Sequence, residues 1–248
     1  MTQSNEQHPV IATDIIAGYG GEEILHRVSM FAPQNKVTVI LGSSGCGKTT
    51  LLKNLIRLYD PWAGSIRLFG EEILDMDEPA FHHILKKIGV LFQYGALLNS
   101  ISVKENVAIP MNQHTDLNEE LIDHLVQVKL GLVDMAHASR KSPAELSGGM
   151  KKRAALARAI ALDPPLLFCD EPSAGLDPIT TEGLDRLLLK MRDNLGMTLV
   201  IVSHTIASIQ RIADHVVFID NGDVLFEGSY KEARKTGIEQ IDYFFEMG

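Results

Sequence analysis

The chain has 248 residues, of which 45% are hydrophobic, so it is long enough to bury a large core without disulfides. Its formal net charge of −9 argues against a nucleic-acid-binding protein without sequence preference, because such a protein needs clustered lysine and arginine. No apolar run reaches the roughly 18 to 20 residues that cross a bilayer, and no signal-peptide hydrophobic stretch occurs at the start. We therefore expect a soluble chain that meets a membrane only through a partner.

The sequence contains only two cysteines, Cys46 and Cys169. Each lies inside a motif rather than in a spaced framework of the kind that secreted, disulfide-rich proteins show. We therefore expect both to be reduced thiols in a cytosolic compartment.

The beginning of the chain is typical of an antiparallel β-sheet. Strand-like stretches at 10–16 and 24–31 flank the turn-rich segment 18–21. Short continuous apolar runs then occur at the positions 37–41, 89–92, 166–169 and 199–202. Continuous apolar strands are typical of a parallel sheet covered on both faces, so we predict an α/β core.

The region between Gln93 and Ala161 shows helical periodicity and no strand signal, with cap residues at 115–120. We interpret 94–161 as a helical subdomain inserted into a core that 1–93 and 162–228 form. Because no linker, repeat or low-complexity tract interrupts the chain, we expect one domain over 1–248, with 229–248 as a C-terminal helical tail.

The last third of the chain predicts a hairpin and a helix. The apolar stretches 216–219 and 224–226 flank Asp220-Asn221-Gly222-Asp223, a strong signal for a tight β-turn. Ile238, Ile241 and Phe245 then recur at helical spacing. This stripe either docks on a neighbouring protein or packs on its own domain, and we expect the second.

A phosphate-binding loop lies between the buried run 37–41 and the helical run 50–57. The residues Gly42, Ser43, Ser44, Gly45, Cys46, Gly47, Lys48 and Thr49 match the pattern GxxxxGK[ST], and Thr50 follows them in the predicted nucleotide site. In this pattern backbone N–H groups surround the β-phosphate, and the lysine adds charge toward the β- and γ-phosphates. We expect Thr49 to offer its hydroxyl to Mg²⁺.

Two carboxylates, Asp170 and Glu171, follow the apolar run 166–169, at the strand end where open α/β sheets hold their ligands. Asp170 is placed to hold Mg²⁺ through water, while Glu171 is the candidate base that orients or deprotonates the attacking water. Alone, this pair would fit an acidic turn ended by Pro172, but the phosphate loop favours the catalytic interpretation.

The segment Leu146-Ser147-Gly148-Gly149-Met150 precedes a long helical run and offers a hydroxyl at a helix N-terminus for an anion. Together with the phosphate loop, the run 146–177 resembles the ABC ATPases, in which this segment is the signature motif. The resemblance implies that Ser147, Gly148 and Gly149 contact the γ-phosphate of ATP bound to the opposite subunit. Two copies would then pair head to tail, with two nucleotides between them. Met150 departs from the glutamine that is commonest at this position.

The same resemblance implies roles for four further residues. Tyr19 is similar to the aromatic that stacks on adenine, and Gln93 to the glutamine that senses Mg²⁺. Asp177 lies in a loop similar to the dimer-contacting loop, and His204 is similar to the switch histidine that bridges the γ-phosphate and Glu171. Each residue also fits an ordinary turn or surface position, and the set of motifs favours the ABC roles.

Three stretches resemble one branch of the family, the ATPase subunits of Mla-type phospholipid transport systems: 91–97, 147–150 with 153–159, and 177–180. The resemblance implies attachment to a transmembrane lipid permease at the cytoplasmic face of the bacterial inner membrane. It also implies an MCE-domain protein and a STAS-domain regulator as partners. The segment 173–177 has the general ABC form and does not favour this branch.

Three other functions remain as alternatives. The ATPase of another importer would carry the same motifs. A nucleic-acid-linked ABC ATPase is disfavoured because the span from Gln93 to Leu146 is too short for long coiled-coil arms, and because the chain is acidic. A regulator without turnover is disfavoured because Glu171 and His204 are both present.

Overall fold

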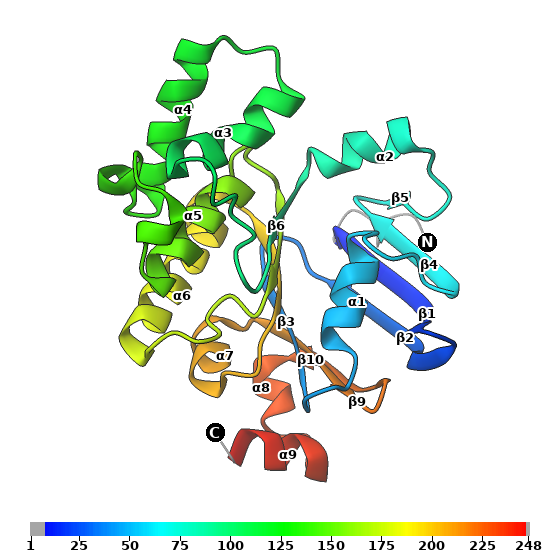
Figure 1. Cartoon of the computed structure of the whole chain (residues 1–248). Helices are drawn as coiled ribbons and strands as arrows, with labels where there is room; N and C mark the ends of the chain where they lie inside the picture. Colours follow the sequence, from blue (N-terminus) through cyan, green and yellow to red (C-terminus); the bar gives the residue numbers. More distant parts are fainter. Residues whose placement is uncertain (1–7, 247–248) are drawn as a thin grey trace.

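Two β-sheets organise residues 8–246, which the computed structural model describes (Figure 1). One sheet has the strand order β2-β1-β4-β5 and the other β10-β9-β3-β8-β7-β6. The strands are β1 (Val10–Tyr19), β2 (Glu22–Ala32), β3 (Val37–Gly42), β4 (Ala63–Leu68), β5 (Glu71–Glu72), β6 (Ile88–Leu91), β7 (Leu166–Asp170), β8 (Thr198–Val202), β9 (His215–Asp220) and β10 (Asp223–Ser229).

Helices cover both sheets and form the upper part of the molecule in Figure 1. The α-helices are α1 (Lys48–Leu55), α2 (Glu78–Leu85), α3 (Val103–His114), α4 (Glu119–Leu132), α5 (Gly148–Ala159), α6 (Pro178–Leu195), α7 (Ile206–Ile212), α8 (Tyr230–Ala233) and α9 (Glu239–Glu246). Two short 3₁₀ helices are η1 (Ala136–Ala138) and η2 (Pro143–Glu145). No helix within residues 8–246 combines the length and apolarity of a membrane span.

The six-stranded sheet confirms the predicted α/β core. Its strands β3, β8, β7 and β6 run parallel, β9 is parallel to β3, and only β10 is antiparallel. Every residue of β3, β7 and β8 is buried, as the continuous apolar runs in the sequence indicate. Parallel pairing brings the carboxyl ends of these strands to one edge, which is where the motif residues follow them.

The four-stranded sheet includes a strand that the sequence did not predict. β1 and β2 are antiparallel as expected, but β4 also pairs with β1, with Val10 opposite Leu68. In β4 only Ile66 and Leu68 are buried, so the alternation is too short to stand out from the turn residues around it. Helix α1 packs between the two sheets, with Leu51 fully buried in their common core.

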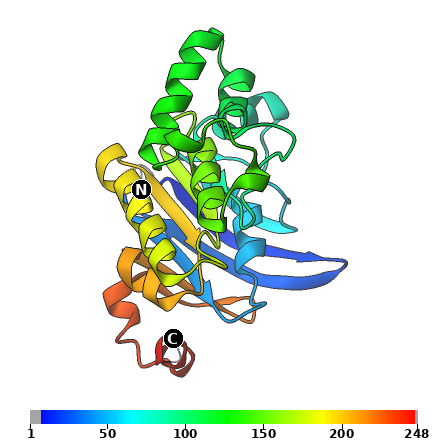
Figure 2. The same cartoon turned by 60° about the vertical axis from the view of Figure 1, so that its left-hand side comes forward.

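Helices α3, α4 and α5 lie between β6 and β7 in the chain and gather at one end of the molecule (green in Figure 2). Side-chain caps fix where each helix begins. Ser102 and Glu105 form a capping box on α3, and Asn118, inside the predicted cap region, accepts a hydrogen bond from the Leu121 N–H at the start of α4. These helices share one apolar core with α6 and the parallel sheet.

The hairpin and the tail also follow the sequence. Asp220 pairs with Asp223 across a two-residue turn in which Asn221 and Gly222 have positive φ, the geometry that this dipeptide favours. In α9, Ile241 and Phe245 are buried in the core cluster that contains Phe218. The stripe therefore packs on its own domain, the alternative that we expected.

Candidate functional site

The phosphate loop joins the end of β3 to the first turn of α1. Gly42, with φ of 145°, lies so close to β9 that a Cβ there would be 1.9 Å from the Ile219 carbonyl oxygen. Gly47 is the N-cap of α1 in the left-handed region, and a Cβ there would be 2.6 Å from Leu25. Side chains are excluded at both points by backbone angles and by space, which explains the glycines of the motif.

Lys48 lies within the curve of this loop and is only 8% exposed. Its ammonium donates to the carbonyl oxygens of Gly42, at 3.0 Å, and Ser43, at 2.6 Å. The Cys46 thiol lies 3.7 Å from the same nitrogen. Cys46 is buried in the core and does not line the cavity that borders the rest of the loop. In the described residues Cys46 and Cys169 are both free thiols, in agreement with the expected reduced state.

Glu171 and His204 form the hydrogen bond at the centre of the site. His204 Nδ1 lies 2.7 Å from Glu171 Oε1, while the other carboxylate oxygen, Oε2, is buried and has no partner among the described residues. Because a carboxylate oxygen accepts hydrogen bonds readily, Oε2 can accept one from water or substrate. The histidine side chain is 62% exposed and faces solvent next to a carboxylate that is buried.

The backbone of Glu171 is in the left-handed region, with φ of 45°. This conformation costs a residue with a side chain roughly 1–2 kcal/mol. The N–H of Glu171 donates to the Val202 carbonyl oxygen at 3.0 Å, and its own carbonyl oxygen accepts from the Ala174 N–H at 3.1 Å. These bonds hold the turn in a form that directs the carboxylate toward His204.

Thr49, Asp170 and Gln93 supply the oxygen atoms of the expected Mg²⁺ site. The Thr49 hydroxyl donates to Asp170 Oδ1 at 3.2 Å, and Gln93 lines the same cavity as Thr49. Hydroxyl, amide and carboxylate oxygens are ligands that Mg²⁺ accepts, so these residues fit the ion. The described residues contain no group of three His, Cys, Asp or Glu side chains that could hold a metal. In nucleotide sites Mg²⁺ is usually held by one or two protein groups together with phosphate oxygens and water.

A cavity of about 620 Å³ brings together most of the predicted nucleotide-binding residues. Its lining contains Gly42, Ser43, Ser44, Gly45, Gly47, Lys48, Thr49, Thr50, Gln93, Glu171 and His204, together with Ile24 and Phe244. The sequence analysis did not identify Ile24 or Phe244. Both are apolar residues outside any motif, and their positions depend on the fold.

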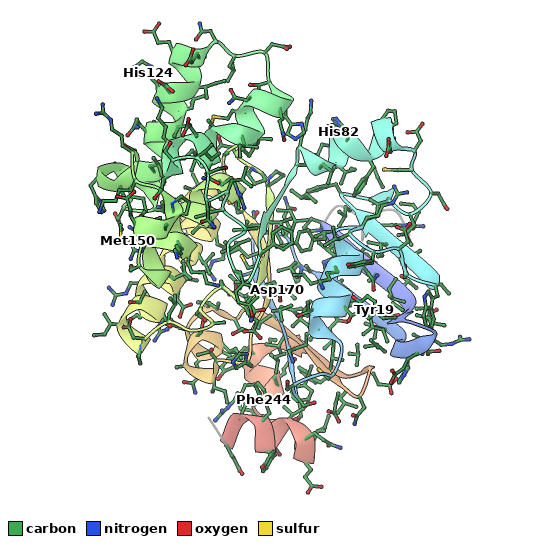
Figure 3. The ribbon with its side chains drawn as sticks, viewed as in Figure 1. Tyr19, His82, His124, Met150, Asp170 and Phe244 are labelled. Carbon is green, nitrogen blue, oxygen red and sulfur yellow. The ribbon has the colours of Figure 1, made fainter. Side chains whose placement is uncertain are left out.

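Other predicted site residues lie outside this cavity. Tyr19 is 42% exposed at the end of β1, where its ring meets Tyr59 edge to face at 5.6 Å. In Figure 3, Tyr19 and Met150 lie on opposite sides of Asp170. The remaining signature residues, Ser147, Gly148 and Gly149, are on α5 with Met150 and do not line the cavity either.

The signature segment is held instead against the loop that contains Asp177. Ser147 is the N-cap of α5, and its hydroxyl oxygen accepts from the Met150 N–H at 3.3 Å. A Cβ on Gly149 would be 2.5 Å from Thr180 Cγ2. Asp177 caps α6, and hydrogen bonds from the Thr180 side chain and backbone hold the pKa of its exposed carboxyl below the usual range. The two segments therefore form one exposed surface.

Lys152 is a buried residue near the site whose contacts the sequence analysis missed. It lies in the second turn of α5 and is 7% exposed. Burial lowers the pKa of its ammonium, and the acidic groups at 169–171 partly oppose this shift. The sequence did contain a signal for this burial, because Lys152 shares a helix face with the apolar residues Ala155, Leu156 and Ala159. Lysine is rarely buried without partners, so a lysine on such a face indicates a paired ammonium.

Comparison with known proteins decides the family. Residues 25–174, more than half of the chain, match the family described as ABC transporter. The chain belongs to this family. An ATP-binding cassette named MJ0796, solved as a dimer in a post-hydrolysis state with ADP and Pi, is 27% identical, with a TM-score of 0.81 over 89% of this chain and 98% of that one.

Two curated relatives extend the comparison. The intermembrane phospholipid transport ATP-binding protein MlaF of Escherichia coli K12 is 40% identical over 233 residues, 94% of this chain and 87% of that protein. A probable ribonucleotide transport ATP-binding protein, Mkl of Mycobacterium tuberculosis H37Rv, is 40% identical over 198 residues, 80% of this chain and 55% of that protein. This ABC protein is therefore an ATPase, the ATP-binding subunit of a transporter.

Asp170 connects the site to the stability of the fold. Burial raises the pKa of its carboxyl, and the hydrogen bond from Thr49 only partly opposes that shift. The folded state therefore binds this proton more tightly than the unfolded state, and the resulting stabilisation is lost as pH rises through the folded pKa.

We expect Asp170→Asn to raise the unfolding midpoint by a few degrees at neutral pH without nucleotide, because it removes the buried charge and keeps an acceptor for Thr49. The gain should shrink at acidic pH, where the parent is protonated, and the variant should lose ATPase activity. Thermal unfolding over a pH series, with Asp134→Asn as an exposed control, measures both effects. A lower midpoint at neutral pH in Asp170→Asn would contradict the expectation.

Proposed function

We propose that this chain is the ATPase subunit of a transporter that moves phospholipid between bacterial membranes. The observation that carries the proposal is the 40% identity to MlaF across 94% of this chain and 87% of that protein. Mkl is equally similar in identity, but this chain spans only 55% of its length. Ribonucleotide transport, the function that its name gives, supplies the second candidate.

The proposal includes the partners that the Mla resemblance implies. A transmembrane permease would hold the chain at the cytoplasmic face of the inner membrane, with an MCE-domain protein beyond it and a STAS-domain regulator beside it. Tyr94, directly after Gln93, has 89% of its surface exposed, which suits a segment that contacts a partner. The same loop would carry movement between the nucleotide site and the permease.

The proposal also includes a second copy of the chain as a partner. Ser147 and Gly148 are exposed and lie outside the cavity that contains Lys48 and Glu171. A head-to-tail pair with twofold symmetry would bring each signature segment to the partner's cavity and form two equal sites. Asp177, on the same exposed surface, would then contact the partner.

Within each site we assign roles from the geometry. The phosphate loop and Lys48 bind the phosphates, while the role of Tyr19 in stacking on the adenine comes from the family resemblance and not from the geometry. Glu171 accepts the proton of the attacking water through its free Oε2, while His204 orients the carboxylate through Oε1. Thr49, Gln93 and Asp170 would hold Mg²⁺, which supplies positive charge next to the phosphate oxygens.

We expect Glu171→Gln to keep ATP binding and to lower kcat by at least a hundredfold, because the amide cannot accept the water's proton. The fall in kcat is measured by phosphate release. Stable dimers should accumulate with ATP, and size-exclusion chromatography detects them. Glu182→Gln, on the exposed face of α6, is the matched control. Turnover at the parent rate in Glu171→Gln would make the assignment of the base wrong.

The shared site predicts complementation between two inactive chains. We expect Glu171→Gln and Ser147→Arg to be inactive alone, and their mixture to regain about a quarter of the parent activity. Half of the randomly formed pairs would be mixed, and each mixed pair would contain one site with an intact Glu171 and an intact partner Ser147. Phosphate release by co-expressed, differently tagged chains measures this. A mixture no more active than its components would indicate a site within one chain.

The substrate is tested in the bacterium that carries the gene. Deletion should increase phospholipid in the outer leaflet of the outer membrane, as measured by head-group labelling of intact cells. The parent gene should reverse this change and the Glu171→Gln gene should not, which ties the effect to ATP hydrolysis. Normal lipid distribution with impaired ribonucleotide uptake would replace the proposal with the second candidate.

A further inference from the structure

Lys152 contacts two segments that are distant in the sequence. Its ammonium donates to the carbonyl oxygen of Gln93 and, at 3.3 Å, to that of Glu171. The ammonium therefore joins the signature helix α5 to the backbone of two residues of the site, Gln93 and Glu171. All three groups come from different elements: α5, the loop after β6 and the turn after β7.

The contact with Glu171 acts on a strained residue. The left-handed backbone of Glu171 sets the direction of its carboxylate, and the Glu171 carbonyl oxygen accepts from both Lys152 and the Ala174 N–H. A charged donor at this carbonyl stabilises the conformation more strongly than a neutral one. Removing the ammonium would leave the turn with one hydrogen bond fewer at the point of strain.

The contact with Gln93 is one of several that fix the following loop on α5. Arg158, one and a half turns further along α5, donates to the carbonyl oxygens of Gly95 and Ala96, each at 2.7 Å. A Cβ on Gly95 would be only 3.2 Å from Ala155. The loop from Gln93 to Ala96 is therefore bound to the same helix whose N-terminus carries the signature residues.

We infer that Lys152 is a positioning residue for hydrolysis, which keeps the Glu171 carboxylate and the Gln93 side chain in register with the signature helix of the same chain. Movement of α5 would be transmitted to Glu171 and Gln93 together, through one ammonium. The inference deepens the proposed function and rests on the role given there to Glu171 as base.

The test uses the full chain in the membrane complex with which it co-purifies. We expect Lys152→Met to lower kcat at least tenfold while KM for ATP changes less than threefold, because the phosphate loop is untouched. Lys152→Arg, which can donate to both carbonyl oxygens, should recover at least half of the parent kcat. Lys190→Met, an exposed lysine on α6, is the control for the loss of charge.

A double-mutant cycle separates positioning from loss of folded protein. In the Glu171→Gln background, Lys152→Met should lower the residual rate by a much smaller factor than in the parent, because the base is already absent and only the contact with Gln93 is lost. A defect in folding would multiply through both backgrounds. Rates are compared at a temperature well below the thermal unfolding midpoint of each variant. If Lys152→Met does not fold, Lys152→Gln replaces it, because glutamine keeps a hydrogen-bond donor and removes the charge.

Three results would overturn the inference: a kcat in Lys152→Met within twofold of the parent, no recovery in Lys152→Arg, or equal losses in both backgrounds. Failure of the proposed function is recognised separately. If Glu171→Gln alone retains the parent kcat, the assigned base is wrong, whatever Lys152→Met does.

Discussion

The pairing of three parallel strands is the constraint on which the rest of the site depends. Ile40 of β3 lies opposite Val202 of β8, and Val202 lies opposite Asp170 of β7. This register places the phosphate loop, the two carboxylates and His204 at one edge of the sheet, although more than 160 residues separate the first from the last. A shift of one residue in either pair would turn every side chain of the shifted strand to the other face of the sheet.

The same edge holds only part of the proposed site. The groups proposed to bind phosphate and to accept a proton line the cavity, whereas the signature residues are held away from it by α5 and by the close approach of Gly149 to Thr180. One residue of α5, Lys152, nevertheless donates hydrogen bonds to the backbone carbonyl oxygens of two cavity-lining residues, Gln93 and Glu171. Helix α5 thus faces two nucleotide sites in the proposed dimer: its N-terminus faces the partner's site, and its second turn supports its own.

Much of this could be predicted from the sequence because the motifs combine local rules. Continuous apolar runs indicated the parallel strands, and the glycine and lysine pattern indicated the loop before α1. Strand β4 was missed because only two of its side chains are buried, so its pairing with β1 depends on partners distant in the sequence. Periodicity along a helix or strand does not reveal which distant segment a side chain reaches. For this reason the sequence did not predict the backbone contacts of Lys152 or the positions of Ile24 and Phe244 in the cavity.

Helix α1 has a further consequence for the life of the protein in the cell. It begins in the phosphate loop and packs between both sheets, so a ligand held by that loop is joined directly to the core. A ligand that binds only the folded chain stabilises it by about 2.7 kcal/mol at a hundred times its dissociation constant. Bound nucleotide would therefore lower the fraction of chains that are unfolded, and with it the exposure of the chain to proteases.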